Sequence, residues 1–119
     1  MGAMTVERSP IRLRPMLLDD VPHSLGLFAQ IGYELECREA ERRFLAVAVS
    51  PVHLLLVAEA EKRIIGLLHA YGRPALEKPP EAVVQAVVVD HSFRDGGVGK
   101  ASMAATERWA SERGIGQCR

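Results

Sequence analysis

The chain has 119 residues, of which 48% are hydrophobic and 25% charged, a composition typical of one folded domain and unlike disordered or collagen-like chains. Fifteen basic residues balance fifteen acidic ones, so no overall charge attracts the chain to nucleic acid or to an anionic membrane. No apolar run approaches the roughly 20 residues that span a bilayer, and the N-terminus lacks the pattern of a signal peptide. We therefore expect a cytoplasmic protein with no nucleic-acid partner and no membrane partner.

Residues 1–4 are interpreted as an expression scar, which leaves residues 5–119 as a single domain. The two cysteines, Cys37 and Cys118, are far apart and lack the paired spacing of a zinc or redox motif. We expect both to be free thiols and predict no metal site.

The N-terminal part of the chain predicts a strand followed by a helix. Residues 11–15 alternate apolar and basic side chains and end in a proline, as in a short strand with one face in water. Asp19 and Asp20 then precede a helix whose first turn accepts Pro22, so a carboxylate is expected to cap it. This helix is predicted to end near Gly32.

Residues 34–48 predict a second helix. Opposite charges pair at helical spacing, Glu34 with Arg38 and Glu39 with Arg43. The apolar positions of this helix are Leu35, Phe44, Leu45 and Val47.

The middle of the chain predicts three strands. Residues 53–60 and 64–71 are apolar runs joined by three charged residues, which fits a hairpin. After a loop rich in proline, residues 82–89 are rich in valine and almost wholly apolar. This composition predicts a central strand that is buried on both faces.

A third helix is predicted over residues 97–113, with Gly114 in the position of a left-handed cap. Its apolar face consists of Val98, Ala101, Ala105 and Trp109. The side chains predicted to point away are Thr106, Glu107, Arg108, Glu112 and Arg113. We expect Trp109 and Met103 to belong to the core and not to a ligand site. Residues 115–119 begin a further strand, so the element order is β-α-α-β-β-β-α with one strand starting at the end.

One segment carries chemistry: the turn Arg94-Asp95-Gly96-Gly97-Val98-Gly99-Lys100, which leads from the valine-rich strand into the third helix. The first turn of a helix leaves N–H donors unpaired and carries a partial positive charge, so it can bind a phosphate group. Glycines let the backbone approach that group closely, and Arg94 and Lys100 supply two local cations. The turn therefore suits a diphosphate, although the same glycines would also serve a tight turn that binds nothing.

Two other phosphate motifs fit this segment less well. A nucleotide-binding loop needs a serine or threonine directly after the lysine to hold magnesium, and that position is Ala101, with the hydroxyl one residue later at Ser102. Only about twenty residues follow the loop, too few for the rest of a nucleotide-hydrolysing domain. The dinucleotide pattern G-x-G-x-x-G is absent.

The segment from Arg94 to Gly99 matches [Q/R]-x-x-G-x-[G/A], the acetyl-coenzyme A signature of the GNAT superfamily of N-acetyltransferases. The chain also resembles that family in the preceding Val87-Val88-Val89-Asp90, in Phe93, and in the order of its elements. The resemblance spans residues 11–119, and residues 82–113 carry its specific features. It implies an α/β (α+β) fold in which helices flank a mixed, mainly antiparallel sheet.

The resemblance implies that acetyl-CoA is the co-substrate and that an amine of a small molecule or a protein attacks its thioester directly. The pantetheine arm would be held by the main chains of Val87, Val88 and Val89. The pyrophosphate site would comprise Arg94, Asp95, Gly96, Gly97, Val98, Gly99 and Lys100.

The catalytic residues stay unidentified. Many members of the family have an acidic residue on the fourth strand where this chain has Gln85 or Ala86, and neither of these can accept a proton. Other titratable residues near the strand ends are interpreted as solvated rim charges or packed strand histidines: Glu59, His69, Glu81, Asp90 and His91.

The resemblance also implies that the family's fifth strand, fourth helix and last two strands would follow residue 119. Without them one edge of the fourth strand is exposed, which predicts a homodimer formed through this edge or a fragment of a longer protein. Two functions stay open: an N-acetyltransferase, and a catalytically silent coenzyme A-binding or interaction module.

Overall fold

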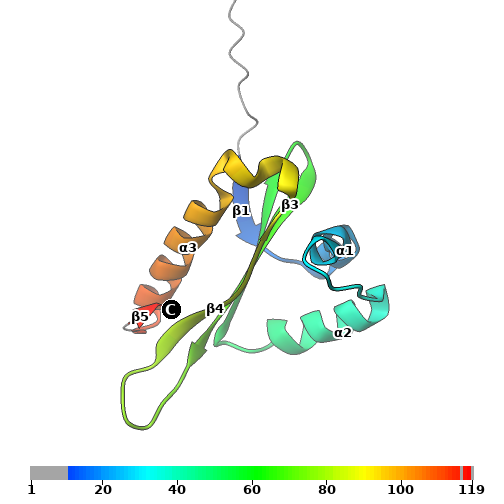
Figure 1. Ribbon diagram of the computed structural model, residues 1–119. Coiled ribbons are helices and arrows are strands. Elements are labelled where there is room, and N and C mark those ends of the chain that lie inside the picture. The colour runs from blue at the N-terminus through cyan, green and yellow to red at the C-terminus, as the bar shows by residue number, and fades with distance from the viewer. Residues whose placement is uncertain (1–10, 116, 119) are drawn as a thin grey trace, which may run out of the picture.

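The computed structural model describes residues 11–115, 117 and 118 and shows one sheet with helices on both faces (Figure 1). The expression scar proposed for residues 1–4 lies outside the described residues. In chain order the elements are β1 (Arg12–Pro15), the 3-10 helix η1 (Leu18–Asp20), α1 (Val21–Gln30), α2 (Cys37–Ala48), β2 (His53–Ala60), β3 (Arg63–Arg73), β4 (Glu81–Val89), the 3-10 helix η2 (His91–Gly96), α3 (Val98–Glu112) and β5 (Gln117–Cys118). This confirms the predicted order, including the strand that begins after the third helix.

The sheet has the order β1-β2-β3-β4-β5, so each strand pairs with its neighbour in the sequence. The first four strands pair antiparallel, and β5 pairs in parallel with β4 at Glu81 and Ala82. β2 and β3 form the predicted hairpin, whose turn residues Glu61 and Lys62 have φ values of 52° and 61°. The mixed, mainly antiparallel sheet expected from the resemblance is therefore present.

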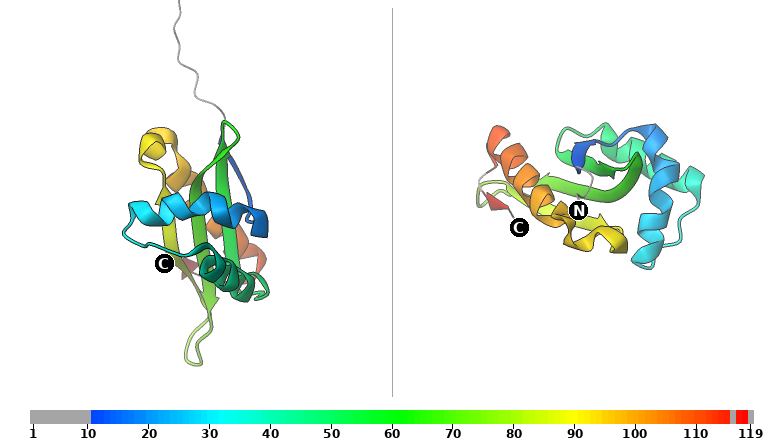
Figure 2. Two further views of the ribbon diagram at one scale, coloured as in Figure 1. Left: turned by 90° about the vertical axis from the view of Figure 1, so that its right-hand side faces the viewer. Right: turned by 90° about the horizontal axis from the view of Figure 1, so that it is seen from above.

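Two helices cover one face of the sheet and one covers the other: α1 and α2 lie together, opposite α3 (Figure 2). α2 begins later than predicted because Glu36 is extended, with φ −74° and ψ 140°. Glu34 therefore lies outside the helix, whereas Glu39 and Arg43 form the predicted ion pair at 3.1 Å. Each helix in the described part of the chain is too short or too polar to cross a bilayer.

The core has a layer on each face of the sheet. Ile65 and Val98 pack between the sheet and α3, and Leu27, Leu67 and Val88 pack between the sheet and α1. β4 contributes to both layers with Val88 and Val89, because successive residues of a strand point to opposite faces. β3 contributes with Ile65 and Leu67, which lie two positions apart but face opposite ways because a bulge shifts the pairing with β2 at Ala58 and Glu59.

The burial of α2 and α3 differs from the prediction at three positions. The predicted core position of Trp109 is confirmed, since its side chain is 8% exposed. The prediction for Met103 is wrong: its side chain lies outside the buried face of α3 and is 38% exposed. Leu45 is half exposed, on the side of α2 that does not meet the sheet. Thr106 is buried because its hydroxyl donates to the Ser102 carbonyl at 2.9 Å, so it needs no water.

β4 is not buried on both faces, which corrects the prediction. Gln85 is exposed and Val87 is 36% exposed, whereas Val88 is buried. Among the described residues only Glu81 and Ala82 have a strand partner on the outer edge. The valine content of β4 correctly predicted a strand, because valine favours extended backbone. The exposure of its side chains depends instead on which elements pack beside it, and this cannot be read from composition.

A partly buried ion pair holds the turn before α1, in place of the predicted helix cap. The Asp20 carboxylate does not cap α1. It accepts two hydrogen bonds from the Arg14 guanidinium, both at 2.8 Å, and one from the Leu17 N–H at 2.7 Å. Hydrogen bonding to Arg14 keeps the pKa of Asp20 below its ordinary value of 3.8. The pair ties β1 to the start of α1.

The start of α3 lies directly on β3 at Gly66. Val98, the first residue of α3, is buried, and a Cβ on Gly66 would lie 3.0 Å from the Val98 Cγ1 atom and 3.3 Å from the Val88 carbonyl oxygen. Glycine at this position therefore lets the helix start close to the sheet.

Replacing Asp20 by Asn should lower the free energy of unfolding by about 2 kcal/mol at neutral pH, because hydrogen bonds to charged groups contribute about 1.5–3 kcal/mol. Since the folded-state pKa of Asp20 is depressed, this stability is present above pH 3.8 and is lost as the pH falls through the folded pKa. Urea unfolding of both proteins along a pH series should show their stabilities converging in acid. The control is Glu39→Gln, whose exposed pair with Arg43 should contribute less than about 0.5 kcal/mol; equal losses in the two variants would contradict the assignment.

Replacing Gly66 by Ala should lower the free energy of unfolding by about 1–3 kcal/mol, the usual cost of overpacking a core. The matched control is Gly26→Ala on the exposed side of α1, where a Cβ would meet nothing within 4 Å. This control should leave stability unchanged or raise it by up to about 1 kcal/mol, because alanine favours a helix. Urea unfolding compares the two, and a Gly66→Ala variant as stable as the wild type would show that the contact is not tight.

Candidate functional site

η2 joins β4 to α3, and sequence analysis did not predict it. Its start is fixed by Asp90, whose carboxylate accepts hydrogen bonds from the Ser92 N–H at 2.9 Å and the Ser92 hydroxyl at 2.6 Å. These bonds lower the pKa of Asp90 below its ordinary value. Gln30, at the end of α1, accepts a hydrogen bond from the His91 N–H at 3.1 Å. Asp90 and His91 thus hold the turn in place against α1.

The first turn of α3 has backbone donors without a partner inside the helix, and it lies beside an open space. Gly97 precedes the helix in the left-handed conformation, with φ 85°, which favours glycine. The helix then begins with the bond from the Ala101 N–H to the Gly97 carbonyl at 2.9 Å. The N–H groups of Val98, Gly99 and Lys100 come before it and have no partner inside the helix. A Cβ on Gly97 or Gly99 would meet none of the described atoms within 4 Å.

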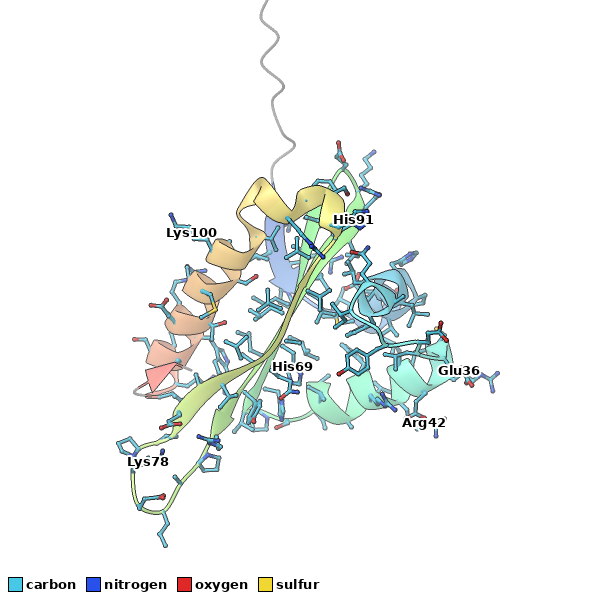
Figure 3. All side chains as sticks on the ribbon, viewed as in Figure 1. Glu36, Arg42, His69, Lys78, His91 and Lys100 are labelled. Atoms are coloured by element: carbon cyan, nitrogen blue, oxygen red, sulfur yellow. The ribbon has the colours of Figure 1, made fainter. Side chains whose placement is uncertain are left out.

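The two predicted cations flank this turn. Arg94, in η2, and Lys100 are exposed, and neither forms an ion pair with another described residue. Figure 3 shows Lys100 on the first turn of α3, pointing away from the sheet. Gly96 ends η2, and the side chain of Asp95 is outside the described part. The residues predicted from the turn therefore lie together at the start of α3.

The outer edge of β4 presents main-chain groups next to this turn. In antiparallel pairing, alternate residues turn their N–H and C=O groups to the same neighbour. The Asp90 N–H donates to the Ile65 carbonyl at 2.8 Å, so Val88 also faces β3, and Val87 and Val89 face the outer edge. Of the three valines predicted to contact a ligand, two direct main-chain groups outward, while Val88 places its side chain in the core.

A bulge in β4 turns two consecutive side chains toward α1 and α2. His69 pairs with Ala86, but Ala70, the next residue of β3, pairs with Val84, so Gln85 is an extra residue on β4. Gln85 and Ala86 both line a pocket of about 380 Å³ between the sheet and these helices. The two positions where the resemblance places an acidic residue thus reach the same pocket.

The wall of this pocket is mainly apolar. It includes Phe28 from α1, Phe44 from α2 and Leu67 from β3. Its polar side chains are Arg43, His69 and Gln85. No Asp or Glu of the described residues lines it.

His69 lies between the sheet and α2 (Figure 3). Its Nε2 atom is 2.8 Å from Nδ1 of His53 on β2, and the Tyr71 ring lies 5.4 Å from the His53 ring, centroid to centroid. Burial, followed by the charge of His53, lowers the pKa of His69 below its ordinary value of 6.5. Sequence analysis did not consider His53 or Tyr71, although the predicted hairpin pairs its two ends, residues 53 and 71, as the structure does.

Of the carboxylates that sequence analysis placed near the strand ends, Glu81 and Glu59 both form ion pairs. Glu81 was expected to be a solvated rim charge, but its side chain is buried beneath Arg73, at 2.8 Å, and Lys78, at 2.9 Å. Glu59 accepts a hydrogen bond from Arg14 at 3.3 Å. Within the described part of the chain, no three His, Cys, Asp or Glu side chains form a group that could hold a metal ion.

The chain matches a known family in sequence. The model of the Acetyltransferase (GNAT) family matches residues 18–118. No curated protein matches the chain.

Solved structures extend the likeness to the fold. Aminoglycoside N-acetyltransferase AAC(6')-Iy in complex with CoA has a TM-score of 0.82 and 22% identity, covering 97% of this chain and 78% of that one. A GNAT family acetyltransferase from Staphylococcus aureus has a TM-score of 0.81 and 21% identity, covering 91% and 83%. Glucosamine-6-phosphate N-acetyltransferase from Arabidopsis thaliana has a TM-score of 0.82 and 19% identity, covering 92% and 80%. Since the family model spans most of its residues, the chain belongs to the GNAT acetyltransferase family.

Proposed function

We propose that the protein binds acetyl-CoA at the turn between β4 and α3 and transfers the acetyl group to an amine. Membership of the GNAT family supports this reaction, and one similar structure, that of an aminoglycoside N-acetyltransferase, contains CoA. The observation that carries the proposal is the open first turn of α3, with Gly97 in the left-handed conformation beside the free edge of β4.

Each part of acetyl-CoA has a matching part of the protein. The diphosphate accepts hydrogen bonds from the first N–H groups of α3, where the helix dipole favours negative charge, and Arg94 and Lys100 add two cations. The pantetheine arm runs along the outer edge of β4 and bonds to the main chains of Val87 and Val89. It thereby carries the thioester toward the bulge at Gln85.

Acetyl transfer needs the acceptor amine in its neutral form. The ordinary pKa of an alkylamine is near 10.4, so fewer than roughly one molecule in a thousand is neutral at pH 7. The amine nitrogen bonds to the thioester carbonyl carbon and loses a proton, the C–S bond breaks, and the CoA thiolate takes up a proton.

We assign the acceptor to the pocket between the sheet, α1 and α2, which we name the acceptor pocket. Its apolar wall favours an amine with an apolar body, and the same wall favours the neutral amine over the ammonium form because it offers a charged group little solvation. A polycationic amino sugar would lose its water there without gaining a carboxylate, at a cost of several kcal/mol. The proposed acceptor is therefore a monoamine that carries an aryl or alkyl group.

Self-association through the free edge of β4 stays a prediction. A second copy would pair with the same main-chain groups of Val87 and Val89 that the pantetheine arm uses. Dimer formation and acetyl-CoA binding would then compete.

Replacing Gly97 by Ala should raise the Kd for acetyl-CoA about tenfold. A non-glycine residue in the left-handed region costs about 1–2 kcal/mol, so the turn of the variant would change its conformation and misplace the N–H donors. Gly99→Ala is the matched control, since Gly99 has no positive φ, has free space around it, and occupies the position where the family signature accepts alanine. Isothermal titration calorimetry of both variants measures the difference. Equal affinities in the two variants would argue against binding at this turn.

Incubation with acetyl-CoA and an amine panel tests the transfer itself. We expect CoA thiol release with aryl- and alkyl-monoamines, and release at least about tenfold slower with an aminoglycoside, because its unpaired charges are desolvated. Binding of acetyl-CoA without thiol release from any amine, a lysine peptide included, would support the catalytically silent module. Absence of binding would contradict both functions.

A further inference from the structure

Two histidines on neighbouring strands connect two cavities through one hydrogen bond. Nε2 of His69 lies 2.8 Å from Nδ1 of His53, with the ring centroids 5.0 Å apart. His69 lines the acceptor pocket beside Gln85. His53 lines a second cavity of about 270 Å³. Trp109 of α3 and Arg113, which follows α3, also line this cavity.

This arrangement lets a proton pass from one cavity to the other. A hydrogen bond between two imidazole nitrogens holds one proton, because one nitrogen donates and the other accepts. His69 has no second hydrogen bond with any described residue, so its Nδ1 atom is available to a ligand in the acceptor pocket. A proton that enters at Nδ1 of His69 displaces the one on Nε2 toward His53, and Nε2 of His53 can release a proton into the second cavity.

We propose that His69 is the catalytic base for the acceptor amine and that His53 relays the proton away, an inference that rests on the proposed acetyl transfer. When the amine nitrogen bonds to the thioester carbonyl carbon it becomes cationic, and His69 takes one of its protons at Nδ1. His69 passes the proton on Nε2 to His53, which releases one to water. The C–S bond breaks, and the departing thiolate takes a proton from water, so charges and protons balance.

The surroundings keep His69 neutral and able to accept a proton. Burial, followed by the charge of His53, lowers its pKa. Arg43 on α2 also lines the pocket, and its charge is paired with Glu39 at 3.1 Å. The other polar neighbours are Tyr71 on β3 and the uncharged Gln85 on β4, while α1 presents apolar side chains to the pocket.

The test compares His69→Gln and His53→Gln with a control, His23→Gln, whose histidine is exposed on α1 and lines neither cavity. With the fastest monoamine of the panel, His69→Gln should lower kcat about 100-fold and leave the KM for acetyl-CoA unchanged, as expected for loss of a general base. His53→Gln should lower kcat less and move the acid limb of the pH profile upward, because the pKa of His69 rises without its neighbour's charge. The control should keep the wild-type profile, and circular dichroism checks that each variant is folded.

A second measurement does not depend on turnover. An NMR titration of the His69 imidazole in the resting protein should give a pKa below 6.5 that rises in His53→Gln. A wild-type kcat in His69→Gln, or a His69 titration that does not respond to His53→Gln, overturns the relay and leaves the proposed transfer standing. Absence of turnover by the wild type overturns the proposed function, and the relay with it.

Discussion

β4 pairs with β3 along its whole length, but in the described residues β5 covers its outer edge at Glu81 and Ala82 alone. An unpaired edge is a liability in most sheets, because its N–H and C=O groups accept an added strand. Here the same groups end beside the open first turn of α3. A ligand with an extended, amide-containing arm joined to a diphosphate can bond to the edge of β4 with its arm and to the first turn of α3 with its diphosphate. The proposed acetyl-CoA site therefore depends on the unpaired part of β4.

The turn is fixed from both sides before any ligand arrives. Beneath it, Val98 packs on β3 at Gly66, so the helix start cannot lift without opening the core. Beside it, Asp90 organises η2 and Gln30 ties that turn to α1. Backbone donors held in this way lose little freedom on binding, which favours both affinity and stabilisation of developing charge.

The bulge at Gln85 joins the two halves of the proposed site. Without an extra residue, Gln85 and Ala86 would point to opposite faces of the sheet; with it, both line the acceptor pocket. Neither side chain can accept a proton. His69, paired directly opposite Ala86, brings an imidazole to the same place from the neighbouring strand. The strand proposed to hold the co-substrate and the strand proposed to supply the base are thus hydrogen-bonded to each other.

The sequence by itself determined the helices, the strands, the hairpin and the glycine signature from Arg94 to Gly99, because periodicity and turn chemistry are properties of neighbours along the chain. It did not determine the exposure of β4, the ion pair of Asp20 with Arg14, or the contact between His53 and His69. Each of these depends on strand register and on which distant segments come within a few ångströms, and a single bulged residue changes both. The tertiary structure alone decided which titratable side chains lie beside the acceptor pocket and which serve to hold the fold.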